Sequence, residues 1–117
     1  MSENFPKCIV SLLRNDPIVM VDVGARNGVI KHMLQFPEVS EIYAFEPETE
    51  VCDESKIKSP SYVKWFDLGL DKTSGQKTFY QMLDGRGNSL VKPKEEIIKK
   101  YSYPDTRMPV KKIHLNL

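Results

Sequence analysis

Three short runs of apolar residues alternate with polar segments over the first 66 residues of the chain. The runs are Ile18 to Val23, Glu41 to Phe45 and Tyr62 to Phe66, and each has the length of a β-strand. The first run is almost continuously apolar, which is typical of a parallel strand that helices cover on both faces. We therefore predict three strands, the first of them buried on both sides.

The segments between these runs have helical patterns. Asn4 to Asn15 carries apolar residues at helical spacing and ends just before a proline. Asn27 to Phe36 is predicted to be a helix that stops at the next proline. Glu46-Pro47 is expected to open a helix that runs to Lys58, because proline in the first helical turn costs no hydrogen bond. The order strand, helix, strand, helix, strand predicts an α/β fold with a parallel sheet.

After the third strand the alternation of strands and helices stops. Turn residues precede the run from Lys77 to Leu83, which predicts a hairpin or edge strand. We expect a loop at 84–88, a short charged helix from Pro93 to Tyr101 and a final strand from Val110 to Leu115. The whole chain, 1–117, has the length of a single domain.

The composition is that of an ordinary globular protein. Hydrophobic residues make up 40% and charged residues 28%, and the net charge of +1 lacks the basic excess that favours nucleic-acid binding. No apolar run has the length of a membrane span, and the first residues lack a signal-peptide pattern. We therefore expect a cytoplasmic protein that binds neither nucleic acid nor membranes.

The cysteines and histidines do not form a metal-binding pattern. Cys8 and Cys52 have no metal-ligand spacing, and reduced thiols are expected in the cytoplasm. His32 and His114 stand far apart in the sequence. We predict no metal site.

The end of the first strand carries the candidate chemistry. The stretch IVMVDVGARNG contains Asp22 and continues through Gly24, Ala25 and Gly28. Ligands of open α/β sheets bind at the carboxyl ends of the strands, where a following helix offers unpaired N–H groups. Glycine lets the backbone turn tightly and approach a ligand closely. The stretch therefore indicates a nucleotide-cofactor site.

Two common phosphate-binding patterns are absent. A dinucleotide fingerprint begun at Gly24 needs glycine at two positions where the chain has Arg26 and Val29, and no G-K-S/T pattern occurs. A nicotinamide-dependent oxidoreductase is therefore the weaker alternative. Glu46 ends the second strand 24 positions after Asp22, where a carboxylate can accept hydrogen bonds from ribose hydroxyls. Adenosine joined to a sulfonium amino acid, as in S-adenosylmethionine, fits this pattern better.

Two motifs carry a family resemblance. VDVGARNG followed by YAFEP resembles the FkbM family of S-adenosylmethionine-dependent methyltransferases, whose members have similar acid-x-Gly and F-E-P signatures at the ends of the first two strands. GLDKTSGQKTFY and GRGNSL also look like the hairpin and the serine-bearing loop of that family. The resemblance implies a Rossmann-like methyltransferase fold and methyl transfer from S-adenosylmethionine to a hydroxyl of a small molecule or sugar.

The resemblance also implies site residues after the first strand. Asp22, Gly24 and Ala25 would line the methionine portion of the cofactor, and Gly28 would allow close packing at the start of the next helix. Ser89 in the serine-bearing loop is a weaker candidate for contact with the acceptor. No residue is assigned as the general base.

Further residues are implied at the ends of the second and third strands. Glu46 would hold the ribose, and Phe45 and Pro47 would flank the adenosine. Asp67 and Leu68, just beyond the third strand, would contact the adenine.

Domains of this family are doubly wound sheets, and the resemblance leads us to expect a further acidic strand–helix segment after Leu117. We therefore interpret the chain as the N-terminal part of such a domain, truncated at its C-terminal side. This interpretation leaves a second hypothesis open, a non-catalytic cofactor-binding remnant or interaction module. An open sheet edge could also mediate self-association.

Overall fold

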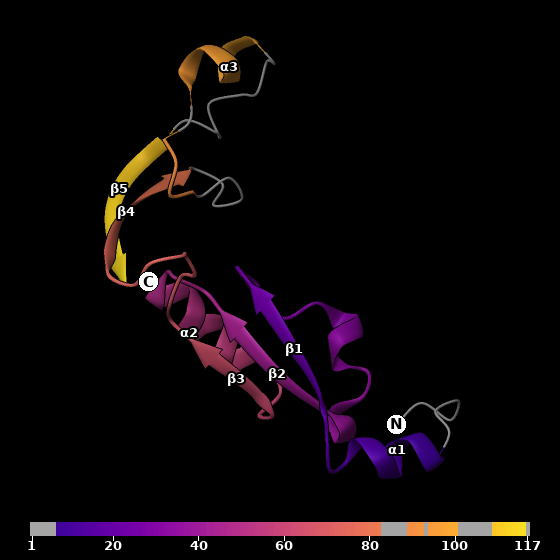
Figure 1. The fold of residues 1–117 in the computed structure, drawn as a ribbon. Coiled ribbons are helices and arrows are strands. Elements are labelled where there is room, and N and C mark those ends of the chain that lie inside the picture. Colours follow the sequence, from indigo (N-terminus) through magenta and orange to yellow (C-terminus); the bar gives the residue numbers. More distant parts are fainter. Residues whose placement is uncertain (1–6, 83–88, 93, 101–108, 117) are drawn as a thin grey trace. The chain divides into compact units, whose positions relative to one another are not determined.

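The computed structural model describes residues 7–82, 89–92, 94–100 and 109–116. Its chain divides into two compact units, residues 1–71 and 72–117 (Figure 1). Several predicted positions lie outside the described residues: 4–6, Leu83, the loop 84–88, Pro93 and Tyr101.

The first unit is built on a parallel sheet of three strands. These are β1 (Ile18–Val23), β2 (Ser40–Phe45) and β3 (Val63–Phe66), in the spatial order β1-β2-β3 (Figure 1). Met20 of β1 is level with Ile42 of β2. All three strands fall where the hydrophobic pattern predicts them, and the prediction of an α/β fold with a parallel sheet is confirmed.

Two α-helices belong to the first unit. The described part of the N-terminal helix is α1 (Lys7–Leu13), and α2 (Thr49–Lys58) connects β2 to β3. The prediction that Glu46-Pro47 forms the start of α2 is wrong. Residues 47 and 48 form a bend, and the backbone N–H of Glu48 donates to the side-chain oxygen Oε1 of Glu46 at 3.1 Å. Glu48 is extended and is the N-cap residue of α2, so the helix begins only after this bend.

The helix predicted from Asn27 to Phe36 is also wrong. That segment contains only the 3₁₀ turn η1 (Lys31–Leu34), and a second turn, η2 (Pro37–Val39), follows it. Asn27 and Gly28 have φ values of +70° and +105°, which a right-handed helix cannot contain. Ile30 is also outside the helical region, with ψ at 131°, so the segment forms only the short turn η1 before Pro37.

The second unit contains an antiparallel strand pair. Strand β4 (Gln76–Met82) pairs with β5 (Pro109–Asn116), and α3 (Glu95–Lys100) lies between them in the sequence. Both strands were predicted, within a residue or two at each end. Ser89 extends the pairing, because its backbone N–H and C=O both bond to Tyr80.

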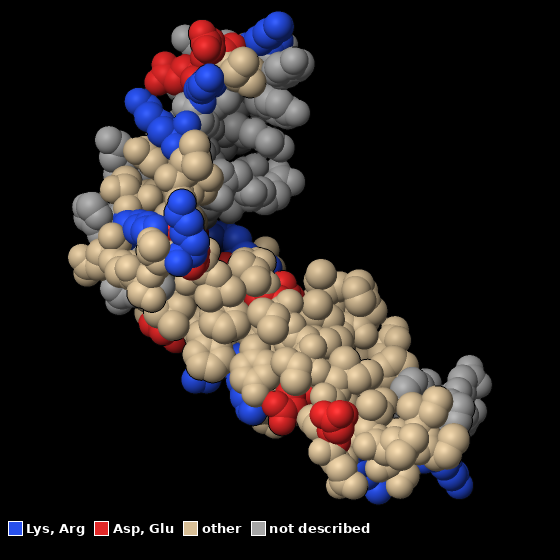
Figure 2. All heavy atoms as spheres, viewed as in Figure 1, with Lys and Arg blue, Asp and Glu red and all other residues tan. Residues whose placement is uncertain are grey.

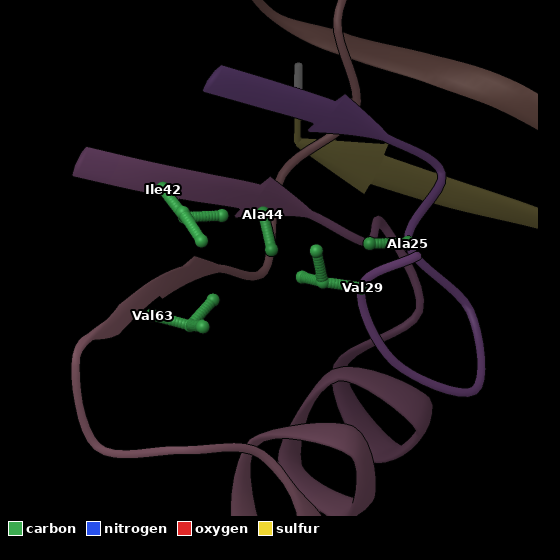
Figure 3. Packing of buried hydrophobic residues seen from close by; sticks show 5 residues of the cluster. All are labelled: Ala25, Val29, Ile42, Ala44 and Val63. Atoms are coloured by element: carbon green, nitrogen blue, oxygen red, sulfur yellow. The ribbon is translucent and has the colours of Figure 1, made fainter. Parts of the chain in front are cut away.

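One face of the parallel sheet forms the core of the first unit. Ile42, Ala44 and Val63 project from this face, and Ala25 and Val29 pack against them from the connection after β1 (Figure 3). Helix α2 adds buried side chains next to β3. We call this side of the sheet the covered face. Glu46, directly after β2, lies on the same side as Ile42 and Ala44.

The alternate residues of the same strands form the opposite side, which we call the open face. It comprises Val19, Val21, Val23, Tyr43, Phe45, Lys64, Phe66 and Glu41, as the register of the three strands requires. Val19 and Val23 are both 60% exposed. In Figure 2 the area over β1 to β3 is mostly uncharged, with side chains of both signs around it.

The prediction that helices cover β1 on both sides is wrong, because one side of β1 belongs to the open face. Among the described residues of the first unit, no helix packs over the valines of β1. Helix α1, the element that precedes β1, instead contacts η2. An apolar run indicates what a strand can bury, whereas the connections decide whether a covering element is present. Within the described part of the chain, no helix has the length and apolar character needed to cross a bilayer.

Candidate functional site

The candidate site lies at the edge of the parallel sheet where all three strands end. Strands of a parallel sheet have their carboxyl ends at the same edge, so connections that are distant in sequence meet there. The predicted residues Asp22, Gly24, Ala25, Gly28, Phe45, Glu46, Pro47, Asp67 and Leu68 all lie at these strand ends or in the connections that leave them.

The turn after β1 is bonded directly to the end of β2. The backbone N–H groups of Gly24 and Ala25 both donate to the carbonyl oxygen of Phe45, at 2.8 and 3.0 Å, and Gly28 N–H donates to the Ala25 carbonyl at 3.0 Å. Gly24 has a φ of +73°, which a residue with a side chain adopts only with strain. A Cβ at this position would meet no atom within 4 Å, so the turn faces open space there.

These bonds restrict what the turn can offer a ligand. The N–H groups of Gly24 and Ala25 are already used by Phe45, and the Ala25 side chain belongs to the core. The sequence-based expectation of an N–H-bearing helix terminus at this point is therefore not met. What Gly24 provides is a backbone without a side chain next to open space.

Asp22, the acid at the end of β1, is engaged with its own connection. Its Oδ2 accepts a long hydrogen bond of 3.4 Å from the backbone N–H of Ile30. This contact fits a local role in closing the loop after β1. The carboxylate is only partly buried, so it also remains accessible from the sheet edge.

Glu46 is the most buried ionisable residue among the predicted site residues. It is 3% exposed, and its Oε1 accepts the hydrogen bond from Glu48 N–H at 3.1 Å. Its own backbone N–H donates to the Phe66 carbonyl, which fixes it between β2 and β3. Burial raises the pKa of the Glu46 carboxyl above its usual value, partly offset by the hydrogen bond from Glu48. A buried carboxylate with few donors around it favours a ligand that brings hydroxyl groups.

An ion pair that the sequence reasoning missed lies beside Glu46. The guanidinium Nη1 of Arg26 is 2.7 Å from Oε1 of Glu48, and both side chains are partly buried. In the sequence, Arg26 stands out only as a departure from a glycine fingerprint. No spacing rule connects residues in two different connections, so only the folded sheet edge brings this pair together.

The structure separates Phe45 from Glu46, although they are neighbours in sequence. The Phe45 ring lies on the open face and stacks on Phe66, with 5.0 Å between ring centroids and 16° between planes. Glu46 points to the other side of the sheet, in line with Ile42 and Ala44. A ligand held by Glu46 on the covered side therefore does not meet the Phe45 ring on that side.

The connection after β3 approaches the start of α2. Burial is the main cause of the raised pKa of the Cys52 thiol, and the nearby carboxylates of Asp67, Asp53 and Glu46 raise it further. Asp67 therefore lies near Cys52 of α2, and Leu68 follows it as a half-buried residue. The raised pKa of the buried, free Cys52 disfavours the reactive thiolate form.

Other candidates have local roles in the structure. The hydroxyl of Ser89 accepts a hydrogen bond from Val91 N–H at 3.0 Å, which makes it part of a turn in the second unit. Among the described residues, no three His, Cys, Asp or Glu side chains gather as a metal site would require.

The fold and the sheet edge together define a small α/β protein with a candidate ligand site at the carboxyl ends of parallel strands. A scan against protein-family models finds no match to this chain, and neither a search of curated proteins nor one of solved structures finds any.

Proposed function

We propose that this chain has a Rossmann-like fold and is a methyltransferase of the FkbM type, which transfers the methyl group of S-adenosylmethionine to a hydroxyl of a small molecule or sugar. The observation that carries the proposal is the buried Glu46 carboxylate beside a glycine turn that faces open space. The motif resemblance supports the same reading.

The residues at the sheet edge suit an adenosine that carries no phosphate. Of the two oxygens of Glu46, Oε1 accepts from Glu48 N–H, and Oε2 makes no hydrogen bond to another described residue. A ribose hydroxyl is a donor of the required kind. Arg26 neutralises Glu48, so Glu46 and Asp22 leave the edge with acidic character, which disfavours phosphate groups and tolerates a cationic sulfonium.

The glycine turn suits the amino-acid end of the same cofactor. At Gly24 nothing lies within 4 Å of where a Cβ would stand, so a ligand chain can pass close to the backbone. When bound, the cofactor supplies an electrophilic methyl group. The chain holds and orients the two reactants, and positioning supplies most of the catalysis in such a transfer. A base would accept the proton of the acceptor hydroxyl, and we assign none.

The first test is calorimetric titration of the purified chain with S-adenosylhomocysteine, with NAD as the control ligand. We expect micromolar binding of S-adenosylhomocysteine alone. Glu46→Gln should weaken binding by about 1.5–3 kcal/mol, because charge-assisted hydrogen bonds to the ribose are lost. Glu41→Gln is the matched control, since Glu41 is on the same strand but belongs to the open face.

Three results would count against the proposal. These are binding of NAD in place of S-adenosylhomocysteine, equal affinity in Glu46→Gln and the unchanged protein, or no binding by a folded chain. If S-adenosylhomocysteine binds, a panel of hydroxyl-bearing small molecules and sugars incubated with labelled S-adenosylmethionine tests the transfer itself.

A second candidate function is a non-catalytic binding or interaction module. The observation that favours it is the apolar open face together with the outer edge of β1, which pairs with no other described strand. Unpaired strand edges are templates for association with another chain. Cofactor binding without turnover, combined with concentration-dependent self-association in analytical ultracentrifugation, would favour this function over the methyltransferase.

A further inference from the structure

The ion pair of Arg26 and Glu48 connects the two segments that frame Glu46. Arg26 lies in the glycine turn after β1, and Glu48 lies in the connection from β2 to α2, where it is the last residue before the helix. Their side chains meet at 2.7 Å and are 31% and 14% exposed. At this depth the pair is shielded from solvent better than most surface ion pairs.

The ion pair continues a set of bonds around Glu46. Glu48 donates its backbone N–H to the Glu46 carboxylate and accepts the Arg26 guanidinium on its own side chain. The turn that carries Arg26 is in turn bonded to the carbonyl of Phe45, the residue before Glu46. A change in the ion pair therefore reaches the Glu46 carboxylate through two short routes.

We propose that Arg26 and Glu48 are positioning residues that hold the Glu46 carboxylate at the ligand edge and set the charge that it presents there. The ligand side of this inference rests on the proposed function, in which Glu46 holds a ribose. Neither residue is required to touch the ligand.

The charged and titratable groups around Glu46 come from three elements. Arg26 faces it from the glycine turn, Glu48 from its own connection and Cys52 from α2, and Asp67, in the connection after β3, acts on the Cys52 thiol rather than on Glu46. Burial is the main cause of the raised pKa of Glu46. The Glu48 carboxylate adds to that rise, whereas the Arg26 guanidinium opposes it. Removing the Arg26 charge should therefore raise the pKa of Glu46, and removing the Glu48 charge should lower it.

The test is a pH titration of the Glu46 side-chain carboxyl by carbon-detected NMR in the ligand-free chain. Arg26→Gln should move the midpoint to higher pH, and Glu48→Gln should move it to lower pH while keeping the backbone donor. Arg26→Lys is the matched control that retains the charge, and its midpoint should stay near that of the unchanged protein. If the pair were only a mechanical clamp, both charge-removing variants would expose Glu46 and lower its midpoint together.

A double variant keeps the test decisive if Arg26→Gln alone does not fold. Arg26→Gln combined with Glu48→Gln removes both charges of the ion pair together, so neither is left facing a neutral partner, which costs less stability than removing one alone. Relative to Glu48→Gln, the double variant should have a higher Glu46 midpoint. An equal or lower midpoint would overturn the proposal.

Binding then tests the ligand side separately. At neutral pH, Arg26→Gln should weaken S-adenosylhomocysteine binding about fivefold, the effect of about 1 kcal/mol, and Arg26→Lys should recover most of the loss. Unchanged affinity would refute the positioning role. If the unchanged protein binds no S-adenosylhomocysteine, the proposed function and this ligand role both fail, while the ligand-free titration still decides whether the pair sets the charge of Glu46.

Discussion

The two faces of the parallel sheet are made by alternate residues of the same strands, yet they differ in how they are stabilised. On the covered face, Ile42 and Ala44 are fully buried beneath the connection after β1 and beside α2. On the open face, Val21 is 49% exposed although it is as apolar as its neighbours. Apolar character is thus common to both faces, and burial is not.

The open face compensates in part through contacts along its own surface. Phe66 stacks against Phe45 and, at 6.3 Å between centroids, against Tyr43. Lys64 extends this row, with its ammonium 4.9 Å from the centre of the Tyr43 ring. Such lateral contacts remove less apolar surface from water than a covering layer does. The comparison predicts that equivalent truncations have unequal costs on the two faces.

The largest effect is expected at the centre of the covered face. Ile42→Ala deletes part of a side chain with no exposed surface and should lower the free energy of unfolding by about 2–5 kcal/mol. Urea denaturation followed by circular dichroism measures the loss. A loss under about 1 kcal/mol would mean that this face is less tightly packed than the structure has it.

A matched pair compares the faces directly. Val63→Ala on the covered face should cost about 2 kcal/mol, because both deleted methyl groups are buried. Val21→Ala makes the same chemical change on the open face of β1 and should cost well under 1 kcal/mol. Equal costs in urea denaturation would indicate that the open face is covered in solution, by a second chain or by another part of this one.

The aromatic row should give a smaller effect. Phe66→Leu removes the ring that stacks on both neighbours and should cost about 1 kcal/mol, the value of one or two aromatic pairs. Thermal unfolding and near-ultraviolet circular dichroism record the change. Phe66→Tyr retains the ring and should behave as the unchanged protein. A loss of stability in both variants would argue against stacking as the cause.

The smallest change in the free energy of unfolding, and one that depends on pH, is expected on substitution of Glu46, the polar residue that follows β2 on the covered face. Its pKa is raised in the folded state, so its contribution to stability is full below its unfolded-state pKa and is lost as pH rises through the folded-state pKa. Glu46→Gln removes this ionisation and retains an acceptor for Glu48 N–H. The variant should therefore be at least as stable as the unchanged protein at neutral pH.

Urea denaturation at acidic and neutral pH checks this sign. The advantage of Glu46→Gln should shrink as pH falls below the folded-state pKa of Glu46. A variant that becomes less stable than the unchanged protein as pH rises would contradict the raised pKa. Retention of an ionised carboxylate that lowers stability is expected where that carboxylate serves a ligand.

Much of the first unit could be predicted from the sequence. The three strands were predicted from short runs rich in apolar residues and from flanking prolines, and their parallel order followed from the intervening segments. The gathering of Asp22, Gly24 and Glu46 at one edge followed from the rule that parallel strands end together. The roles of these residues toward a cofactor remain predictions.

The errors have a common cause in the connections. The helix expected after β1 fails because Asn27 and Gly28 take positive φ values, which Asn and Gly adopt more readily than other residues. The start of α2 shifts past Pro47 because Glu46 bonds to Glu48 N–H. Both errors depend on backbone conformation and side-chain hydrogen bonds, which the spacing of hydrophobic residues does not predict.

The sequence by itself determined the strands, their parallel pairing and the edge at which the charged residues end, because hydrophobic period and chain connectivity act locally. Only the tertiary structure decided which face is covered, how deeply Glu46 is buried and that Arg26 meets Glu48. Burial and ion pairing depend on elements that are distant in sequence. Their free energies arise only once the connections have closed around the end of the sheet.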